Sequence, residues 1–246
     1  MLLKKWGSTS RMQKEPKHSQ SNSDIFSFGG AGTVLLISLL AFIGLYPLML
    51  GEIAGRMAGG LILTVIFVAG TMTASDSRIH RTISIALAVA ALGLQVAWLS
   101  THRTTIEIIF VAMFAAFCLY TALVILRHVL APGPVYAETV HAALSVYILL
   151  ALFWAGAYAL VEISLPGAFS LGAPSPNAQM PLEGAYLFAD MLHLSIATLT
   201  STGYGDITPV APFARSLCQL EQLIGVFYIA VLISRLLGLY QSLDRE

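Results

Sequence analysis

Charged residues are scarce in this chain. Among 246 residues only 13 are Lys or Arg and 13 are Asp or Glu, whereas 57% are hydrophobic. A soluble domain carries about twice that charged share. The shortage excludes an ordinary soluble globular protein. The formal net charge of zero gives no sign of a nucleic-acid partner, and none is expected.

Cysteine is also rare, and catalytic constellations are missing. The two cysteines, Cys118 and Cys218, both fall inside apolar runs, where they fit core packing better than a disulfide or metal site. The six histidines are scattered, and no Ser-His-Asp set or paired carboxylates accompany them. We therefore expect neither an enzyme nor a bound cofactor.

Long apolar runs are abundant instead. A helix needs roughly 20 apolar residues to cross a bilayer. Six runs approach or exceed that length, and they predict an all-α membrane protein with six transmembrane helices: 31–50, 57–73, 83–100, 106–126, 137–161 and 213–239. A shorter apolar piece, 187–199, lies between the last two runs. It predicts a re-entrant pore helix, which a membrane tolerates only inside protein or beside a water-filled cavity.

The polar ends and the basic residues predict the orientation. Residues 1–29 carry no cleavage pattern and predict a disordered cytoplasmic tail. Placing both termini in the cytoplasm leaves only Arg56, Arg103 and Arg215 outside. The expected location is the plasma membrane, or the inner membrane of a bacterium. The expected domains are a peripheral four-helix bundle over 30–130, a pore domain over 131–240 and a short cytoplasmic tail over 241–246.

The segment from Thr200 to Asp206 carries the most specific chemistry. Its sequence, TSTGYGD, alternates Gly203 and Gly205 with Tyr204. A filter for a monovalent cation must replace the ion's water shell with a close ring of oxygens, and backbone carbonyls can supply them. Turning consecutive carbonyls toward one axis requires residues that accept positive φ, as glycine does. A surface turn is the alternative for these residue types, but the position between two spanning helices favours a filter.

Residues 198–209, TLTSTGYGDITP, resemble the signature of potassium channels, particularly prokaryotic six-helix pore-loop channels, and the likeness extends over 135–240. The resemblance implies that K⁺ is coordinated by carbonyls of the filter and by the Ser201 hydroxyl. The filter residues are Ser201, Thr202, Gly203, Tyr204 and Gly205. The resemblance also implies a homotetramer among membrane lipids, because one chain offers one loop and the ring of the family is built from four loops. K⁺ is then the permeant ion.

Further residues are expected to support the filter. Asp190 is the expected N-cap of a short helix over 191–200, whose C-terminal dipole favours a cation. We expect the filter to be supported by four further residues: Thr200, Asp206, His193 and Glu221. Glu221 is an ionisable residue within a spanning segment, and we expect it to lie against the back of the short helix. The resemblance makes Gly225 an inner-helix hinge, whereas close helix packing is its alternative.

The filter region departs from the family in two respects. Relatives have Thr and a β-branched apolar residue where this chain has Ser201 and Thr202, which predicts a looser innermost site. Relatives also place two tryptophans where His193 and Leu194 stand. Asp206 is then expected to face solvent or to pair with His193 or a neighbouring chain. His193 is interpreted as a hydrogen-bonded packing residue, with a pH sensor as the alternative.

The first four helices lack the chemistry of a voltage sensor. Residues 106–126 contain no Lys or Arg, and one charge crossing 100 mV yields only about 2.3 kcal/mol. Pro132, Gly133 and Pro134 would also break a linker helix. We therefore expect a channel that is not voltage-gated, with lipid, pH, permeant ions or an unidentified regulatory partner acting on its gate. The alternatives are a weakly selective cation channel, an ion-coupled potassium transporter, and a membrane enzyme or scaffold.

Overall fold

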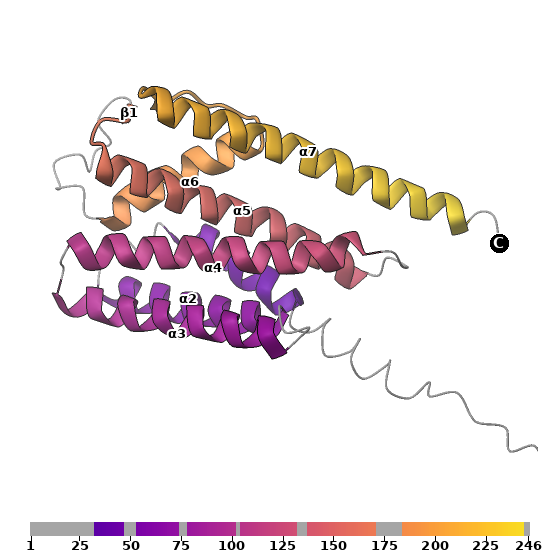
Figure 1. The fold of residues 1–246 in the computed structure, drawn as a ribbon, viewed down its shortest axis with the longest axis horizontal. Coiled ribbons are helices and arrows are strands. Elements are labelled where there is room, and N and C mark those ends of the chain that lie inside the picture. The colour runs from indigo at the N-terminus through magenta and orange to yellow at the C-terminus, as the bar shows by residue number, and fades with distance from the viewer. Residues whose placement is uncertain are drawn as a thin grey trace, which may run out of the picture.

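Long helices make up almost all of the part of the chain that the structure describes, as Figure 1 shows. The structure is a computed structural model, and it describes residues 32–46, 53–73, 78–101, 104–131, 137–170 and 184–243. A first helix spans Gly32–Tyr46. The remaining elements are α2 (Ile53–Thr73), α3 (Arg78–Thr101), α4 (Thr104–Leu130), α5 (Ala137–Ser164), β1 (Phe169–Ser170), α6 (Gly184–Leu199), β2 (Thr208–Pro209) and α7 (Pro212–Leu243).

Three of the described helices are long and apolar enough to cross a membrane: Thr105–Leu130, Glu138–Ser164 and Pro212–Arg235. The other apolar helices give shorter stretches, so the mostly helical membrane protein is confirmed and the count of six spans stays a prediction. The tail 1–29, the end of the first run and the Pro132–Pro134 linker lie outside the described residues. Helix α7 extends to Leu243, beyond the expected boundary of the pore domain.

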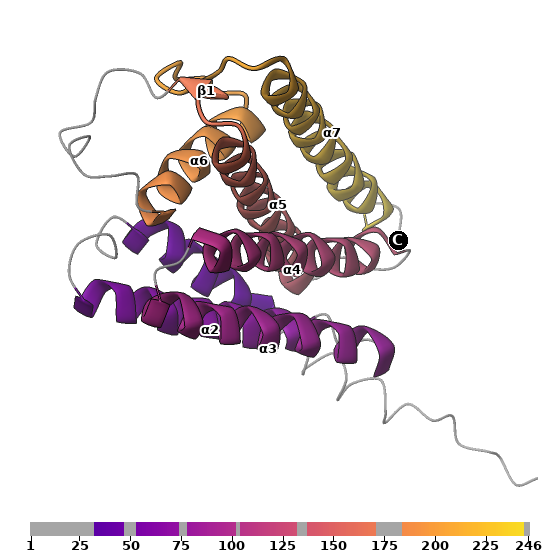
Figure 2. The same cartoon turned by 60° about the vertical axis from the view of Figure 1, so that its left-hand side comes forward.

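Aromatic and small side chains join the helices before α5. Phe67 of α2 makes edge-to-face contacts with Phe114 and Phe117 of α4, with ring centroids 6.1 and 4.7 Å apart. Gly70 permits this approach, because a Cβ there would lie 2.9 Å from the Phe117 ring. Helix α4 in turn runs beside α5 in both views (Figures 1 and 2). The apolar core is therefore continuous from the first four helices into α5.

A glutamate shapes the turn that ends α5. The carboxylate of Glu162 accepts hydrogen bonds from the N–H groups of Gly167, at 2.7 Å, and Phe169, at 3.0 Å. Gly167 has a φ of 84°, a conformation that suits glycine. The chain then enters β1, which pairs antiparallel with β2 in the register Phe169↔Pro209. This small sheet, absent from the all-α expectation, ties the segment after α6 to the end of α5.

Helix α6 begins earlier than predicted. It starts at Gly184, so Asp190 lies inside the helix and the N-cap prediction for it was wrong. The reason is packing: Leu187, Met191 and Ser195 are buried and spaced four residues apart, so the buried face continues upstream of Asp190. Figure 2 shows α6 crossing beside α5 and α7, with its C-terminal end directed toward the loop that leads to β2.

Candidate functional site: the pore loop

The C-terminal end of α6 holds the start of the loop by main-chain hydrogen bonds. The carbonyl oxygen of Ala197 accepts from the N–H groups of Thr202, at 2.8 Å, and Gly203, at 3.2 Å. These bonds satisfy a carbonyl that lacks a helical partner at the helix end. Thr200 donates its hydroxyl to the Ile196 carbonyl at 2.7 Å and lies 2.8 Å from the Thr202 hydroxyl. The first loop residues are thereby fixed to the helix.

The loop alternates the sign of its backbone φ angle. Ser201, Gly203 and Gly205 have φ values of 57°, 58° and 77°, whereas Thr202 and Tyr204 between them are not in the positive region. Ser201 is the one non-glycine residue with positive φ among the described residues, and such a conformation costs about 1–2 kcal/mol. Alternating conformations direct successive N–H groups to one side, and therefore successive carbonyls to the other. This is the backbone pattern that a carbonyl-lined site requires.

His193 connects α6 to the far end of the loop. Its Nε2 lies 2.9 Å from Oδ2 of Asp206. Because an ionised carboxylate only accepts hydrogen bonds, Nε2 carries the hydrogen. The imidazole also stacks on the ring of Tyr204, with centroids 5.3 Å apart and an interplanar angle of 18°. Of the alternatives for Asp206, the pairing with His193 is thus present in the structure, although both side chains remain partly exposed.

The two aspartates near His193 are in different electrostatic environments. Burial alone would raise the pKa of Asp206, but the Ile207 N–H and the adjacent His193 outweigh it and lower that pKa below the ordinary value. Desolvation by burial raises the pKa of Asp190, with His193 opposing and Asp206 adding to the rise. The anion of Asp206 is therefore stabilised relative to an ordinary aspartate, whereas the anion of Asp190 is destabilised.

Behind the loop, a buried glutamate joins three helices. Glu221 of α7 is 0% exposed, and its Oε1 lies 2.5 Å from the hydroxyl of Ser195 on α6. The hydroxyl of Tyr158 on α5 donates to Oε2. Ser195 also approaches the carbonyl oxygen of Ala151 at 2.8 Å. The expected contact between Glu221 and the back of α6 is therefore present.

Gly225 lies against the end of α6. A Cβ at this position would stand 2.1 Å from the carbonyl oxygen of Leu199. That oxygen also accepts the Tyr147 hydroxyl at 2.9 Å, and the Tyr147 ring stacks on Tyr228. The structure thus gives Gly225 a close-packing role within a continuous helix, which was the alternative to the hinge. Its action as a hinge stays a prediction.

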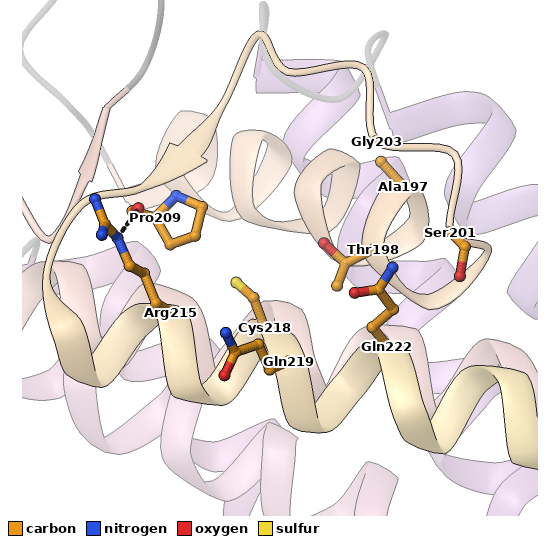
Figure 3. Close-up of a pocket in the computed structure, with 9 residues that line it drawn as sticks. All are labelled: Ala197, Thr198, Ser201, Gly203, Pro209, Arg215, Cys218, Gln219 and Gln222. Carbon is orange, nitrogen blue, oxygen red and sulfur yellow. Dashed lines mark hydrogen bonds between the residues drawn. The ribbon is translucent and has the colours of Figure 1, made fainter.

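A cavity of about 330 Å³ separates the loop from α7 (Figure 3). Cys218 and Gln222 of α7 point toward it from one side, and Thr198 and Ser201 border it on the other. Arg215 closes one end by donating from Nε to the carbonyl oxygen of Pro209 at 3.2 Å. The cavity places the hydroxyl-bearing start of the loop beside the polar side chains of α7.

An arginine links the other end of α7 to the first four helices. Nη2 of Arg235 lies 2.6 Å from the carbonyl oxygen of Ala131, just after α4. This hydrogen bond joins two segments of one chain. The C-terminal end of a helix attracts a cation, because its last carbonyls lack partners.

Sequence reasoning missed several residues that hold the loop. No sequence motif marks Ser195, Tyr158 or Tyr147. Their hydrogen-bond partners lie 26 to 63 positions away along the chain. A weak signal was available, because polar hydroxyls within apolar helices need a partner when buried. Glu162 gave a clearer one, since a carboxylate before a Pro-Gly turn suits the free N–H groups there.

Comparison with known proteins agrees with this geometry. Residues 146–242, which contain α6, the loop and all but the last residue of α7, match a family model described as ion channel. The chain is also similar to Protein LctB of Bacillus caldotenax, with 34% identity over 89 residues. That alignment covers 36% of this chain and 63% of LctB, less than two thirds of the relative. No solved structure matches the chain.

The matched region contains the signature sequence, the helix before it and the long helix after it. The predicted resemblance to pore-loop ion channels is therefore confirmed over residues 146–242, and the long apolar helices make the chain a helical membrane protein.

Proposed function

We propose that this protein is a subunit of a potassium-selective channel that conducts K⁺ passively through the central pore of a homotetramer. The observation that carries the proposal is the alternating φ of residues 201–205. In such a segment the carbonyls of Ser201, Thr202, Gly203 and Tyr204 can face one axis and replace the water shell of a dehydrated ion. Gly205 completes the loop, and the Ser201 hydroxyl adds a further oxygen.

The electrostatics of the loop favour a cation. Helix α6 ends at Leu199, immediately before the loop, so its partially negative end is directed toward the entering ion. No Lys or Arg occurs between Gly184 and Ala214. Asp206 adds an anionic group at the far end, held by His193 and the Ile207 N–H. In this proposal Thr200 supports the same segment from the helix side.

The exposure of the loop supports assembly of several chains. Tyr204 is 69% exposed in the single chain, and apolar side chains of α7 such as Leu220 and Phe227 are also more than half exposed. One loop supplies one wall of a pore, so a closed ring of copies is needed to surround an ion. Four copies in the plasma membrane, with six spans each, make up the proposed channel.

Voltage gating does not form part of the proposal. Helix α4 carries Arg127 and His128 only in its last turn, and its middle is apolar. A charge at the helix end moves through little of the membrane field. The gate is proposed to respond to lipid, pH, permeant ions or a regulatory partner.

The experiment is a potential measurement in sealed liposomes that contain K⁺ and are diluted into Na⁺. Selective K⁺ efflux creates an inside-negative potential, which a voltage-sensitive dye reports. We expect this signal from the wild-type protein and its loss in Gly203→Ala, because alanine disfavours the φ of 58°. Gly167→Ala is the matched control, since Gly167 also has positive φ but lies outside the loop. Equal leakage of K⁺ and Na⁺ from the wild type would contradict potassium selectivity.

A further inference from the structure

The buried contacts of Glu221 form a closed path through three helices. The path leaves α5 at the Tyr158 hydroxyl, reaches Oε2 of Glu221 on α7, and continues from Oε1 to the Ser195 hydroxyl on α6. Ser195 then returns to α5 at the Ala151 carbonyl. Ala151 and Tyr158 lie about two helical turns apart, so both ends face the same side of α5. The path contains three oxygen–oxygen contacts of hydrogen-bond length or shorter.

Each of these contacts needs a hydrogen between its two oxygens. A hydroxyl supplies one hydrogen, whereas a carbonyl and an ionised carboxylate supply none. Tyr158 and Ser195 together supply two. The third must therefore come from the carboxyl group of Glu221.

An ionised Glu221 would leave one contact without a hydrogen. Ser195 would have to donate to Oε1, and its oxygen would then face the Ala151 carbonyl at 2.8 Å with lone pairs on both sides. That distance is normal only when a hydrogen lies between the oxygens. The arrangement with a protonated carboxyl satisfies all three contacts.

The surroundings of Glu221 also disfavour a negative charge. The groups around it are Tyr158 and Tyr147 from α5, Ser195 from α6 and the Cys218 thiol from its own helix, and all four are neutral. Within the part of the chain that the structure describes, the one ion pair recorded joins His193 to Asp206. A fully buried carboxylate without a cation is strongly unfavourable, and neutralisation is the usual outcome.

We infer that Glu221 is a neutral carboxylic acid at neutral pH and acts as a positioning residue for α6. Its Oε1–H donates to the Ser195 oxygen, Ser195 donates to the Ala151 carbonyl, and Tyr158 donates to Oε2. The resulting path fixes α6 between α5 and α7, five residues before the loop begins at Thr200. Loss of the proton at alkaline pH removes one donor and introduces a buried charge. The effect on the filter rests on the proposed function, whereas the protonation state does not.

Infrared spectroscopy of the full chain in liposomes tests the protonation state. The difference between wild type and Glu221→Gln at neutral pH should contain the carbonyl stretching band of a protonated carboxylic acid, and Ser195→Ala should shift that band. The matched control is Glu162→Gln, because Glu162 accepts two N–H bonds at the partly exposed end of α5. Its difference spectrum should show carboxylate bands. Carboxylate bands alone in the Glu221 spectrum would overturn the inference.

Amide hydrogen exchange tests the positioning role. Glutamine keeps one donor and one acceptor. Exchange in α6, expressed relative to the intrinsic base-catalysed rate at each pH, should therefore stay close to wild type in Glu221→Gln and lose its increase at alkaline pH. Ser195→Ala should exchange about tenfold faster in α6, as expected for one buried hydrogen bond. Unchanged α6 exchange in Ser195→Ala, or the same alkaline increase in Glu221→Gln, would contradict positioning by a neutral acid. Neither result depends on ion conduction, so a failure here leaves the proposed function standing.

Discussion

Gly225 of α7 packs directly against the carbonyl oxygen of Leu199, the last residue of α6. A Cβ at position 225 would lie 2.1 Å from that oxygen, which is backbone and cannot rotate away. We predict that Gly225→Ala destabilises the protein by about 1–3 kcal/mol, the usual cost of overpacking a filled interior. Thermal unfolding in detergent measures the change.

Gly93→Ala is the matched control for this prediction. Gly93 lies in α3 and has no atom within 4 Å of a Cβ at that position. Alanine there should be neutral or stabilise the helix by roughly 0.5–1 kcal/mol. An unchanged midpoint in Gly225→Ala would show that α7 moves away from Leu199 at little cost, as a hinge would permit.

The two aspartates beside His193 should affect acid stability in opposite directions. The pKa of Asp206 is lowered, so its anion contributes stability at neutral pH, and this contribution is lost as the pH falls through the lowered pKa. Asp206→Asn should therefore lower stability at neutral pH, with a deficit that disappears in acid. Asp190 has a raised pKa, so its anion lowers stability at neutral pH. The stability of Asp190→Asn should therefore equal or exceed that of the wild type at neutral pH, and the difference should fade in acid.

Unfolding midpoints measured from neutral to acidic pH check both curves. The test is the sign of the difference in midpoint between each variant and the wild type at neutral pH. The size of the difference is less informative, because Asp206 is largely exposed and its effect is screened by solvent. If both variants changed the unfolding midpoint in the same direction at neutral pH, the opposite pKa shifts of Asp206 and Asp190 would be contradicted.

Glu162 should control the order of the turn between α5 and β1. We predict that Glu162→Ala increases hydrogen exchange at the Gly167 and Phe169 amides roughly tenfold, because each loses a carboxylate acceptor. Exchange measured by mass spectrometry gives the result. Glu138→Ala, at the other end of α5, should leave these amides unchanged. Equal protection in both variants would show that the β1–β2 pairing alone holds the turn.

The helices were largely predictable from apolar runs, and their ends were not. The run 213–239 identified α7, but the helix continues to Leu243 because hydropathy marks the apolar part and not the last hydrogen bond. Asp190 has the residue type of an N-cap, yet the buried face from Leu187 onward extends α6 past it. Residue type gives a local preference, and tertiary packing decides where the helix begins.

Features of the site were predictable where they depend on residue type alone, such as the backbone conformation of a glycine. The spacing of Gly203 and Gly205 predicted positive φ at both, and both have it. Ser201 also has positive φ, which its residue type did not indicate. The position of Glu221 against α6 was expected, but its partner Tyr158 lies 63 residues away and becomes a neighbour only through packing. The contact between Gly225 and Leu199 likewise depends on how α6 meets α7.

We propose that the loop over residues 201–205 selects potassium. The most direct measurement is the reversal potential of the purified protein in a planar bilayer, with the K⁺ ratio varied against a Na⁺ background. A potassium-selective loop should give a shift of about 59 mV for each tenfold change in the K⁺ ratio, the value for a single monovalent permeant ion. A reversal potential that does not move with K⁺ would contradict it.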